Sequence, residues 1–223
     1  TIAVGSNVFT AKTILIATGG WPFVPDIPGK EFAITSNEAL DLEWRPPRII
    51  IVGGGYIAVE FAGIFAGLGS KTSLVVRSKL LRGFDDDLGR ELDDAMQRDG
   101  VDIVYGCNIV SIEKTAAGLV AHMDNGEKLE ADSIMYATGR NPNTTGIGLE
   151  EAGVELGGSG EIMVDEYSKT NVDSIYAIGD VTDRMQLTPV ALHEAMCFVS
   201  TVVLGKPTKP GYDNIATAVF STP

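Results

Sequence analysis

A run of three glycines, Gly53-Gly54-Gly55, follows a β-branched apolar stretch and precedes a stretch with helical apolar periodicity. Arg48–Val52 predicts a buried strand, and Tyr56–Gly67 predicts a helix. With Ala58, the glycines fit G-x-G-x-x-A, the pattern of a strand-to-helix turn that binds the pyrophosphate of a dinucleotide. This turn predicts a parallel α/β domain of the βαβ type.

Each small residue of the pattern has a physical reason to be there. Gly53 permits the tight turn, and Gly55 lets backbone N–H groups approach a pyrophosphate, while Ala58 allows close packing of helix on strand. The helix N-terminus adds partial positive charge and free N–H donors. A tight turn without a ligand is the alternative interpretation.

The residues after the next predicted strand, Lys71–Val76, favour NADPH over NADH. An NAD site has an acidic residue at this strand end to bind the ribose 2′-hydroxyl, whereas this chain has Arg77 and, five positions later, Arg82. A guanidinium forms bidentate contacts with a phosphate. In a chain of net charge −13, two arginines at this place indicate a 2′-phosphate site. Ordinary surface charge is the alternative.

Further elements follow from the periodicity of the apolar residues. Asp86–Gly100 predicts an amphipathic helix with Leu88, Leu92, Ala95 and Met96 on its apolar face. The expected further strands are Thr13–Ala17 (buried on both faces), Val101–Tyr105, Asn108–Lys114, Gly118–Met123, Lys128–Ala131, Ser133–Ala137, Ile162–Val164, Ser174–Ile178 and Thr217–Phe220. Three strands from Asn108 to Ala131 are predicted to form a meander. Glu38–Leu42 and Pro189–Leu204 predict helices, the second with Ala191, Ala195, Val199 and Val202 on one face.

Composition restricts the possible partners. The acidic balance of the 223 residues disfavours non-specific binding to nucleic acid or membrane, and the longest apolar run is too short to cross a bilayer. Cys107 and Cys197 lack metal-ligand or CxxC spacing and are predicted to be buried thiols in a reducing cytosol. No metal site is predicted. The chain starts at Thr1 without an initiator Met or a signal peptide, so it is expected to begin within a domain.

Three strand ends carry glycine where a sheet edge could meet a ligand: 17–20, 137–140 and 176–180. Taken singly, each could be a simple strand terminus, and Asp180 could instead cap the next helix. Together they resemble the pyridine nucleotide–disulfide oxidoreductases, in which the pattern T-x5-Y-A-I-G-D, here Thr170–Asp180, is the second FAD motif. Pro22–Ser36, Gly53–Ile64, Leu81–Asp85 and Leu187–Ala191 resemble the glutathione reductases in particular, with the trypanothione reductases close behind.

The resemblance implies roles for individual residues. Tyr56 would be a lid that moves when nicotinamide enters, and Glu60 would lie by the nicotinamide and the flavin, unless it is an ordinary helix-surface glutamate. Asp180 would bind the ribityl chain of FAD. The implied NADPH residues are Gly53, Gly55, Tyr56, Ile57, Glu60, Arg77, Arg82, Gly139 and Arg140. The implied FAD residues are Thr18, Gly19, Gly179, Asp180, Leu187 and Thr188. His122 and His193 match no motif position and are interpreted as structural.

The fold implied by the resemblance is α/β: a Rossmann-like βαβ NADPH-binding domain with a β-meander, inserted between segments of an FAD-binding domain of the same class. Residues 1–36 would end the first FAD segment and form the crossover, and 37–145 would be the NADPH domain. Residues 146–212 would be the second FAD segment, and 213–223 would start a dimerisation domain.

The implied activity belongs to a longer parent protein. NADPH would reduce FAD, FAD would open a redox disulfide, and the dithiol would reduce glutathione disulfide in a cytoplasmic homodimer. The family's cysteine pair and first FAD fingerprint would precede Thr1, and its acid–base histidine would follow Pro223. This chain alone is therefore expected to be inactive. The alternatives are another acceptor (trypanothione disulfide or a metal ion), a ferredoxin- or quinone-directed flavoprotein, and an isolated NADPH-binding module.

Overall fold

The computed structural model describes residues 1–221 and divides into two compact units. Of the described residues, the central unit comprises 22–139 with 217–221, and the flanking unit comprises Thr1–Trp21 with Arg140–Ala216. The last two residues of the predicted segment 213–223 lie outside the described residues. The four predicted domain segments stay predictions. No helix in the described part is long and apolar enough to span a membrane.

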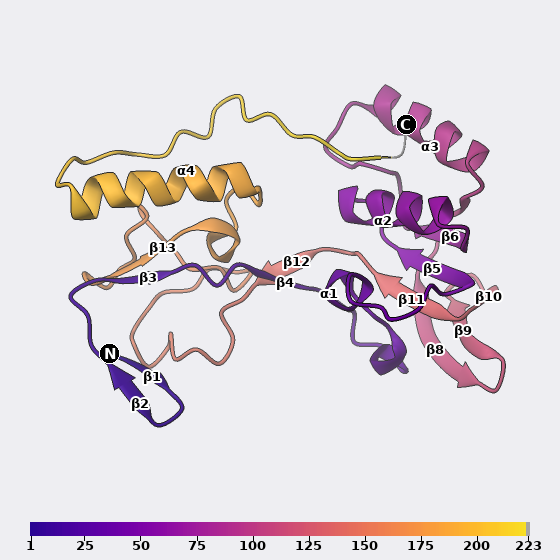
Figure 1. The fold of residues 1–223 in the computed structure, drawn as a ribbon, viewed down its shortest axis with the longest axis horizontal. Coiled ribbons are helices and arrows are strands. Elements are labelled where there is room, and N and C mark those ends of the chain that lie inside the picture. The colour runs from indigo at the N-terminus through magenta and orange to yellow at the C-terminus, as the bar shows by residue number, and fades with distance from the viewer. Residues whose placement is uncertain (222–223) are drawn as a thin grey trace. The chain divides into compact units, whose positions relative to one another are not determined.

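Figure 1 labels the helices and strands in chain order. The central unit contains η1 (Lys30–Phe32), α1 (Ser36–Ala39), β5 (Arg48–Val52), α2 (Tyr56–Gly67), β6 (Lys71–Val76), α3 (Asp86–Arg98), β7 (Asp102–Tyr105), β8 (Ile109–Thr115), β9 (Gly118–Met123), β10 (Lys128–Ala131) and β11 (Ser133–Tyr136). The flanking unit contains β1 (Ile2–Val4), β2 (Asn7–Phe9), β3 (Ile14–Ile16), β12 (Arg140–Pro142), β13 (Ile175–Ala177), η2 (Gly179–Thr182), α4 (Thr188–Phe198) and the π-helical turn η3 (Val199–Val203). Strand β4 (Gly20–Pro22), which pairs with β12, ends at the boundary between them.

The central unit is built on a parallel sheet with the strand order β11-β5-β6-β7. The sequence order of these strands reverses between β5 and β11, because α2 carries the chain from β5 to one side and β11 joins on the other. Ligands of open α/β sheets bind at such a switch point, outside the carboxyl ends of the strands. A ligand site is therefore expected at the residues that follow Val52 and Tyr136.

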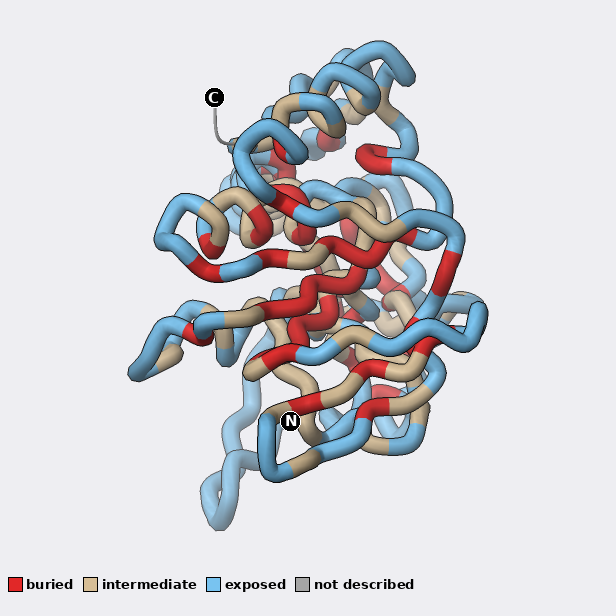
Figure 2. The backbone as a smooth tube through the Cα atoms, turned by 90° about the vertical axis from the view of Figure 1, so that its right-hand side faces the viewer, coloured by how far each residue is buried: buried red, intermediate tan, exposed pale blue. Residues whose placement is uncertain are grey.

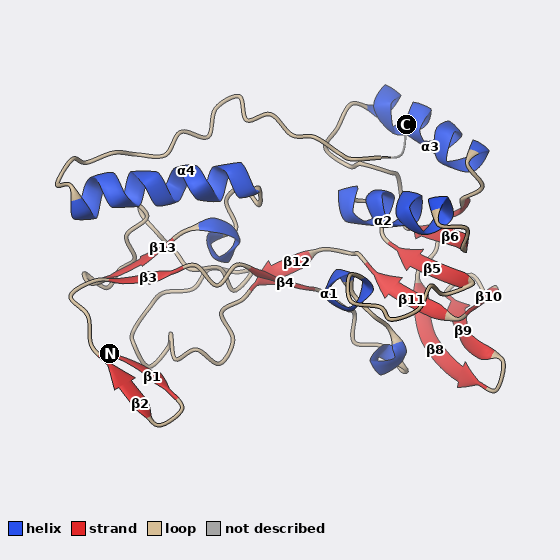
Figure 3. Ribbon diagram, in the orientation of Figure 1, coloured by secondary structure: helices blue, strands red, loops and turns tan. Residues whose placement is uncertain are grey.

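Both faces of this sheet are covered, which explains its continuous apolar strands. Ile49 and Ile51 pack with α2 and Met96 of α3 on one face. Ile50 and Val52 pack on the other face with the antiparallel meander β8-β9-β10. Figure 3 shows the two helices on one side of the sheet and the meander on the other, and Figure 2 shows buried residues concentrated along the central strands.

The turn from β5 into α2 leaves no room for a side chain at Gly53. Its φ is +142°, and an added Cβ would lie 2.4 Å from the Ala137 carbonyl oxygen after β11. The same Cβ would lie 3.2 Å from Cβ of Ala58, which is fully buried in the first turn of α2. Gly53 is thus required by two close approaches, one to the neighbouring strand and one to the helix.

The flanking unit contains the parallel pair β3–β13, in the register Ile14↔Ile175 and Ile16↔Ala177. Apolar residues of these strands and of the loops from 149 to 181 form its core. The strand around Ile14 was predicted to be buried on both faces, but Leu15 is 38% exposed because the residues packed on this strand lie on its other face. Two strands joined around Gly5-Ser6-Asn7 were predicted in residues 1–17, whereas the structure has three, of which β1 and β2 pair in a hairpin.

Several predicted elements differ in extent. Helix α1 begins at Ser36, because Thr35 caps it in a reciprocal capping box with Glu38. Leu88 of α3 is 59% exposed rather than on the buried face. Ile162–Val164 forms a single bridge, Leu156↔Ile162, and no strand.

The last two predicted elements need larger corrections. Thr217–Phe220 is irregular rather than a strand; there Val219 packs on the central core. The buried residues of α4 are Val190, Glu194 and Cys197, whereas the predicted face was Ala191, Ala195, Val199 and Val202. The predicted face was displaced by about one residue, because the periodicity was read from apolar residues alone and Glu194 is charged.

We predict that Gly53→Ala destabilises the chain strongly. A side chain at this backbone conformation costs about 1–3 kcal/mol, and overpacking against a backbone carbonyl costs about as much again. Gly55→Ala is the matched control, because an added Cβ there meets nothing within 4 Å. The measurement is chemical denaturation of both variants. The free energy of unfolding of the control should change by less than about 1 kcal/mol. Equal stability of the two variants would contradict the packing argument.

Candidate functional site

The carboxyl edge of the central sheet presents an open helix N-terminus. Gly55 is the N-cap of α2 and offers no side-chain cap, and no acidic residue occupies the first turn. The first N–H groups of a helix have no partner within the helix. Space in front of Gly55 is open, whereas an added Cβ at Gly54 would lie 2.7 Å from the Lys79 carbonyl oxygen. An anion could therefore approach the backbone N–H groups at Gly55 without meeting a side chain there.

The loop after β6 folds back onto these glycines. The Leu81 N–H donates to the Gly54 carbonyl at 2.6 Å, and the side chains of Leu80 and Leu81 are buried in the core beneath. Arg77, at the end of β6, and Arg82 are exposed. The glycine loop and the two predicted phosphate-binding arginines thus share one edge of one sheet.

The two guanidinium groups are available for a ligand. Arg82 donates to the Ser78 hydroxyl at 3.4 Å, and Arg77 has no hydrogen-bond or ion-pair partner within residues 1–221. Lys79, the third cation of the loop, forms an ion pair with Asp86, which lowers the pKa of that carboxyl. Two exposed guanidinium groups without a carboxylate partner among residues 1–221 therefore lie at this edge, although the chain as a whole is acidic.

Three predicted residues lie in the first turns of α2. Tyr56 begins the helix and is 39% exposed, and Ile57 packs partly against the core. Glu60 lies one turn further, where its carboxylate accepts a hydrogen bond from the Phe220 N–H at 3.0 Å. Sequence alone gave no sign of this contact, since the two residues are far apart in the chain.

The predicted pair Gly139 and Arg140 is divided between the units. Gly139, with φ of +138°, follows β11 in the central unit, and its carbonyl accepts from the Phe23 N–H at 2.9 Å. Arg140 belongs to the flanking unit, where its guanidinium donates to the Gly20 carbonyl. Their roles in NADPH binding stay predictions.

A second sheet edge brings together four residues predicted to bind FAD. Because β3 and β13 are parallel, Thr18 and Gly19 after one strand lie at the same edge as Gly179 and Asp180 after the other. The Ile178 N–H donates to the Ile16 carbonyl at 3.1 Å, which continues the pairing up to Gly179. This juxtaposition is what the two strand-end motifs predict.

The Thr18–Gly19 turn is held by Asn143. The Thr18 hydroxyl donates to the Asn143 carbonyl at 2.8 Å, and the Asn143 N–H donates to the Gly19 carbonyl at 2.9 Å. The amide side chain of Asn143 also donates to the Thr18 carbonyl at 3.3 Å. These contacts fix the strand end without using a side chain of the Gly179–Asp180 turn.

The start of α4 lies against the second of these strand ends. Leu187 is its N-cap and Thr188 its first residue; no side chain caps the helix, and its first turn contains no acidic residue. An added Cβ at Gly179 would contact Cβ of Ala191 at 3.4 Å. The helix N-terminus is therefore uncapped beside the glycine turn, as an electron-rich ligand would require.

Asp180 does not cap a helix, so that alternative is wrong. Ile178 is the N-cap of η2 and Leu187 that of α4. The Asp180 carboxylate is partly exposed and has no hydrogen-bond or ion-pair partner in the part of the chain that the structure describes. Sequence reasoning missed Glu194, whose carboxylate accepts from the Gly179 N–H at 2.6 Å. Its spacing from Val190 and Cys197 places it on their helix face, but no local pattern indicates its partners.

Neither cysteine is placed for redox chemistry. Cys107 and Cys197 are free and buried, as predicted, and burial raises the pKa of both thiols. A raised pKa disfavours the thiolate that disulfide exchange needs. His193 accepts from the Gly211 N–H at 3.4 Å and His122 lies 3.1 Å from Glu113, both structural contacts. Residues 1–221 contain no group of three or more His, Cys, Asp and Glu residues that could hold a metal ion.

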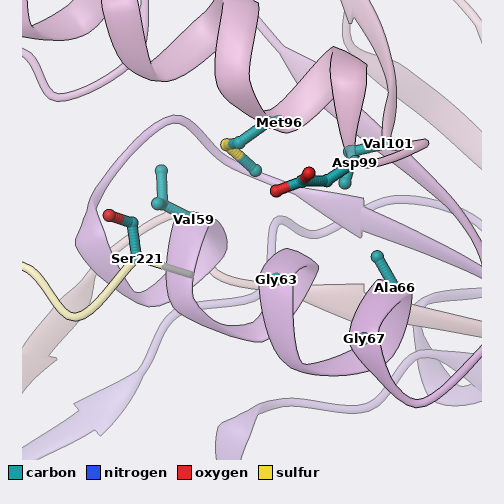
Figure 4. Close-up of a pocket in the computed structure, with 8 residues that line it drawn as sticks. All are labelled: Val59, Gly63, Ala66, Gly67, Met96, Asp99, Val101 and Ser221. Atoms are coloured by element: carbon teal, nitrogen blue, oxygen red, sulfur yellow. The ribbon is translucent and has the colours of Figure 1, made fainter. Parts of the chain in front are cut away.

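A cavity of about 270 Å³ lies elsewhere in the central unit, between α2 and the end of α3. Figure 4 shows its lining: Val59, Gly63, Ala66, Gly67, Met96, Asp99, Val101 and Ser221. None of these is a predicted site residue, and Asp99 is the single charged side chain among them. The cavity is therefore separate from the glycine and arginine loops.

Known proteins resemble the chain over its whole length. Glutathione reductase of Burkholderia cepacia is 48% identical over 98% of the chain and 49% of its own length. The chloroplastic/mitochondrial glutathione reductase of Pisum sativum is 49% identical over 100% of the chain and 41% of its own length. Trypanothione reductase of Trypanosoma congolense is 46% identical over 96% of the chain and 44% of its own length. The chain thus spans about half the length of these relatives, or somewhat less.

Solved structures agree at the level of the fold. The HOCl-induced flavoprotein disulfide reductase RclA from Escherichia coli superimposes with a TM-score of 0.88 at 31% identity, covering 95% of this chain and 49% of that one. The family model described as pyridine nucleotide-disulphide oxidoreductase matches residues 2–195. The chain therefore belongs to the pyridine nucleotide-disulphide oxidoreductases, with an α/β fold that matches flavoprotein disulfide reductases over part of their length.

Proposed function

We propose that this chain supplies the NADPH site and part of the FAD site of a glutathione-disulfide reductase. The observation that carries the proposal is the edge of the central sheet, where the Arg77–Arg82 loop is hydrogen-bonded to the glycine turn at the uncapped start of α2. The identity to glutathione reductases over the whole chain supports the same conclusion. In such an enzyme NADPH supplies the reducing equivalents, and FAD passes them to a disulfide.

The residues of the central unit would act by binding and orientation. The backbone N–H groups at Gly55 and in the first turn of α2 would hold the pyrophosphate, and Arg77 and Arg82 would hold the 2′-phosphate. Tyr56 would cover the nicotinamide side, and Glu60 would fix its position. In the flanking unit, Asp180 would accept hydrogen bonds from the ribityl hydroxyls of FAD. The uncapped start of α4 would stabilise negative charge on the ring system.

The whole-protein properties belong to the same proposal. We infer a homodimer with glutathione disulfide as substrate, acting in the cytoplasm, where free thiols such as Cys107 and Cys197 persist. The trypanothione reductases match almost as well, so trypanothione disulfide is the second candidate acceptor. The described residues offer neither a cysteine pair nor a disulfide, so the chain by itself would bind nucleotides without turnover.

We predict that Arg77→Ala and Arg82→Ala each weaken NADPH binding by roughly tenfold or more, because each removes a charge-assisted contact to the 2′-phosphate. Affinity for NADH should change much less, since it lacks that phosphate. Arg98→Ala, at the exposed C-terminal end of α3, is the control of equal charge change. Calorimetric titration of the three variants tests this. A loss of NADH affinity equal to that of NADPH would contradict the 2′-phosphate assignment.

The acceptor is tested in the full-length protein by following NADPH oxidation with glutathione disulfide and, separately, with trypanothione disulfide. We expect rapid turnover with glutathione disulfide and NADPH, and little with NADH. Turnover with trypanothione disulfide alone would replace the acceptor and keep the cofactor assignment. A protein that binds FAD and NADPH but reduces neither disulfide would refute the substrate class.

A further inference from the structure

Helix α4 buries a carboxylate that the proposed function does not use. Glu194 is 1% exposed, on the same face as Val190 and Cys197. Burial of an ionised carboxylate is unfavourable unless hydrogen bonds and opposite charge compensate it. Such a residue therefore has to be explained by its partners.

Those partners come from three different segments. Oε2 accepts from the Gly179 N–H at 2.6 Å. Oε1 accepts from the Tyr212 hydroxyl at 2.6 Å and lies 3.1 Å from Nη2 of Arg184. Burial and the hydrogen bond to Glu194 raise the pKa of Tyr212, so the phenol stays protonated and donating. One carboxylate thus joins α4 to the turn after β13, to the loop after η2 and to the segment after η3.

The contacts around the turn form a closed ring. Arg184 Nε donates to the Thr182 hydroxyl at 3.2 Å, and that hydroxyl donates to the Gly179 carbonyl at 2.8 Å. Glu194 accepts from the N–H of the same glycine and pairs with the same arginine. Both backbone groups of Gly179 are therefore held, one by the carboxylate and one by the hydroxyl.

The position of this turn decides where Asp180 points. Gly179 has φ of +73°, a left-handed conformation that needs support from its surroundings. Asp180 follows directly, and its carboxylate has no side-chain or backbone partner within residues 1–221 that would orient it. The backbone of the turn is thus the main constraint on this carboxylate, and Glu194 holds that backbone.

We propose that Glu194 is a positioning residue for FAD, which fixes the Gly179 amide so that the Asp180 carboxylate is preorganised for the cofactor. The proposal rests on the proposed function, in which Asp180 binds FAD. The sequence suggests no such role, since Glu194 lies outside every motif. A rigidly held ligand side chain binds more tightly because less order has to be imposed on binding.

The test is a double-mutant cycle on FAD affinity in the full-length apoprotein, measured by quenching of flavin fluorescence. Glu194→Ala should weaken FAD binding roughly tenfold or more, because a charge-assisted hydrogen bond to the turn is lost. If Glu194 acts through Asp180, the double variant Glu194→Ala/Asp180→Ala should bind no more weakly than Asp180→Ala alone. If the fold-losses of FAD affinity in the two single variants multiply in the double variant, the two residues act independently and the proposal is overturned.

Conservative variants separate positioning from folding. Glu194→Gln keeps an oxygen that can accept from the Gly179 N–H and should restore FAD affinity to within about threefold of the wild type, a change below 1 kcal/mol. Tyr212→Phe is the matched control, because it removes a donor to the same carboxylate but leaves the Gly179 contact. A tenfold loss in Tyr212→Phe as large as that in Glu194→Ala would contradict the assignment.

Folding of every variant is checked by denaturant unfolding of the apoprotein. Glu194→Leu fills the same space without an acceptor and serves if the alanine variant does not fold. If neither Glu194→Ala nor Glu194→Leu folds, while Glu194→Gln folds and binds FAD tightly, the carboxylate is required for folding rather than for positioning. That result would overturn the proposal. A wild-type protein that binds no FAD would refute the proposed function as well, whereas FAD binding with independent effects refutes this inference alone.

Discussion

Two strands and a helix meet at Gly53 with no space left for a side chain. Because Gly53 has no side chain, the Ala137 carbonyl after β11 and the Ala58 side chain in α2 can both lie close to its backbone. Because α2 starts immediately there, its free N–H groups face the carboxyl edge at the switch point. The Arg77–Arg82 loop then completes that edge through the Leu81 to Gly54 hydrogen bond.

Electrostatics follow from this packing. The chain carries a net charge of −13, so an anionic ligand meets an unfavourable field over most of its surface. At the carboxyl edge of the central sheet, the helix N-terminus and two exposed guanidinium groups offer positive charge, whereas the third cation, Lys79, is paired with Asp86. In the flanking unit the charge that organises the strand end is negative and buried: the Glu194 carboxylate pairs with Arg184 and accepts a hydrogen bond from a backbone amide.

Sequence patterns predicted the central sheet well because its strands are buried on both faces and its turn needs glycine. Arg48–Val52, Tyr56–Gly67 and Lys71–Val76 have the predicted bounds in the structure. Patterns failed where tertiary contacts decide. Ile162 makes a bridge instead of a strand, and a charged residue lies on the buried face of α4.

The candidate site shows the same division. The glycines and arginines follow strand ends, so their meeting at one edge could be predicted from parallel pairing alone. The contact of Glu60 with Phe220 and that of Glu194 with Gly179 join positions distant in sequence, and no local pattern encodes them. Apolar periodicity does not predict a buried carboxylate, because its burial in a core depends on compensating partners from other segments of the fold.

In the proposed function, the edge beyond Gly53 and Arg77 recognises a dinucleotide through its 2′-phosphate. Calorimetric titration of the wild-type chain with 2′-phospho-ADP-ribose and with ADP-ribose measures this directly, without nicotinamide or flavin. We expect the phosphorylated ligand to bind at least about tenfold more tightly, with a preference that falls as salt is raised. Equal affinity for the two ligands, or a preference that salt does not change, would contradict it.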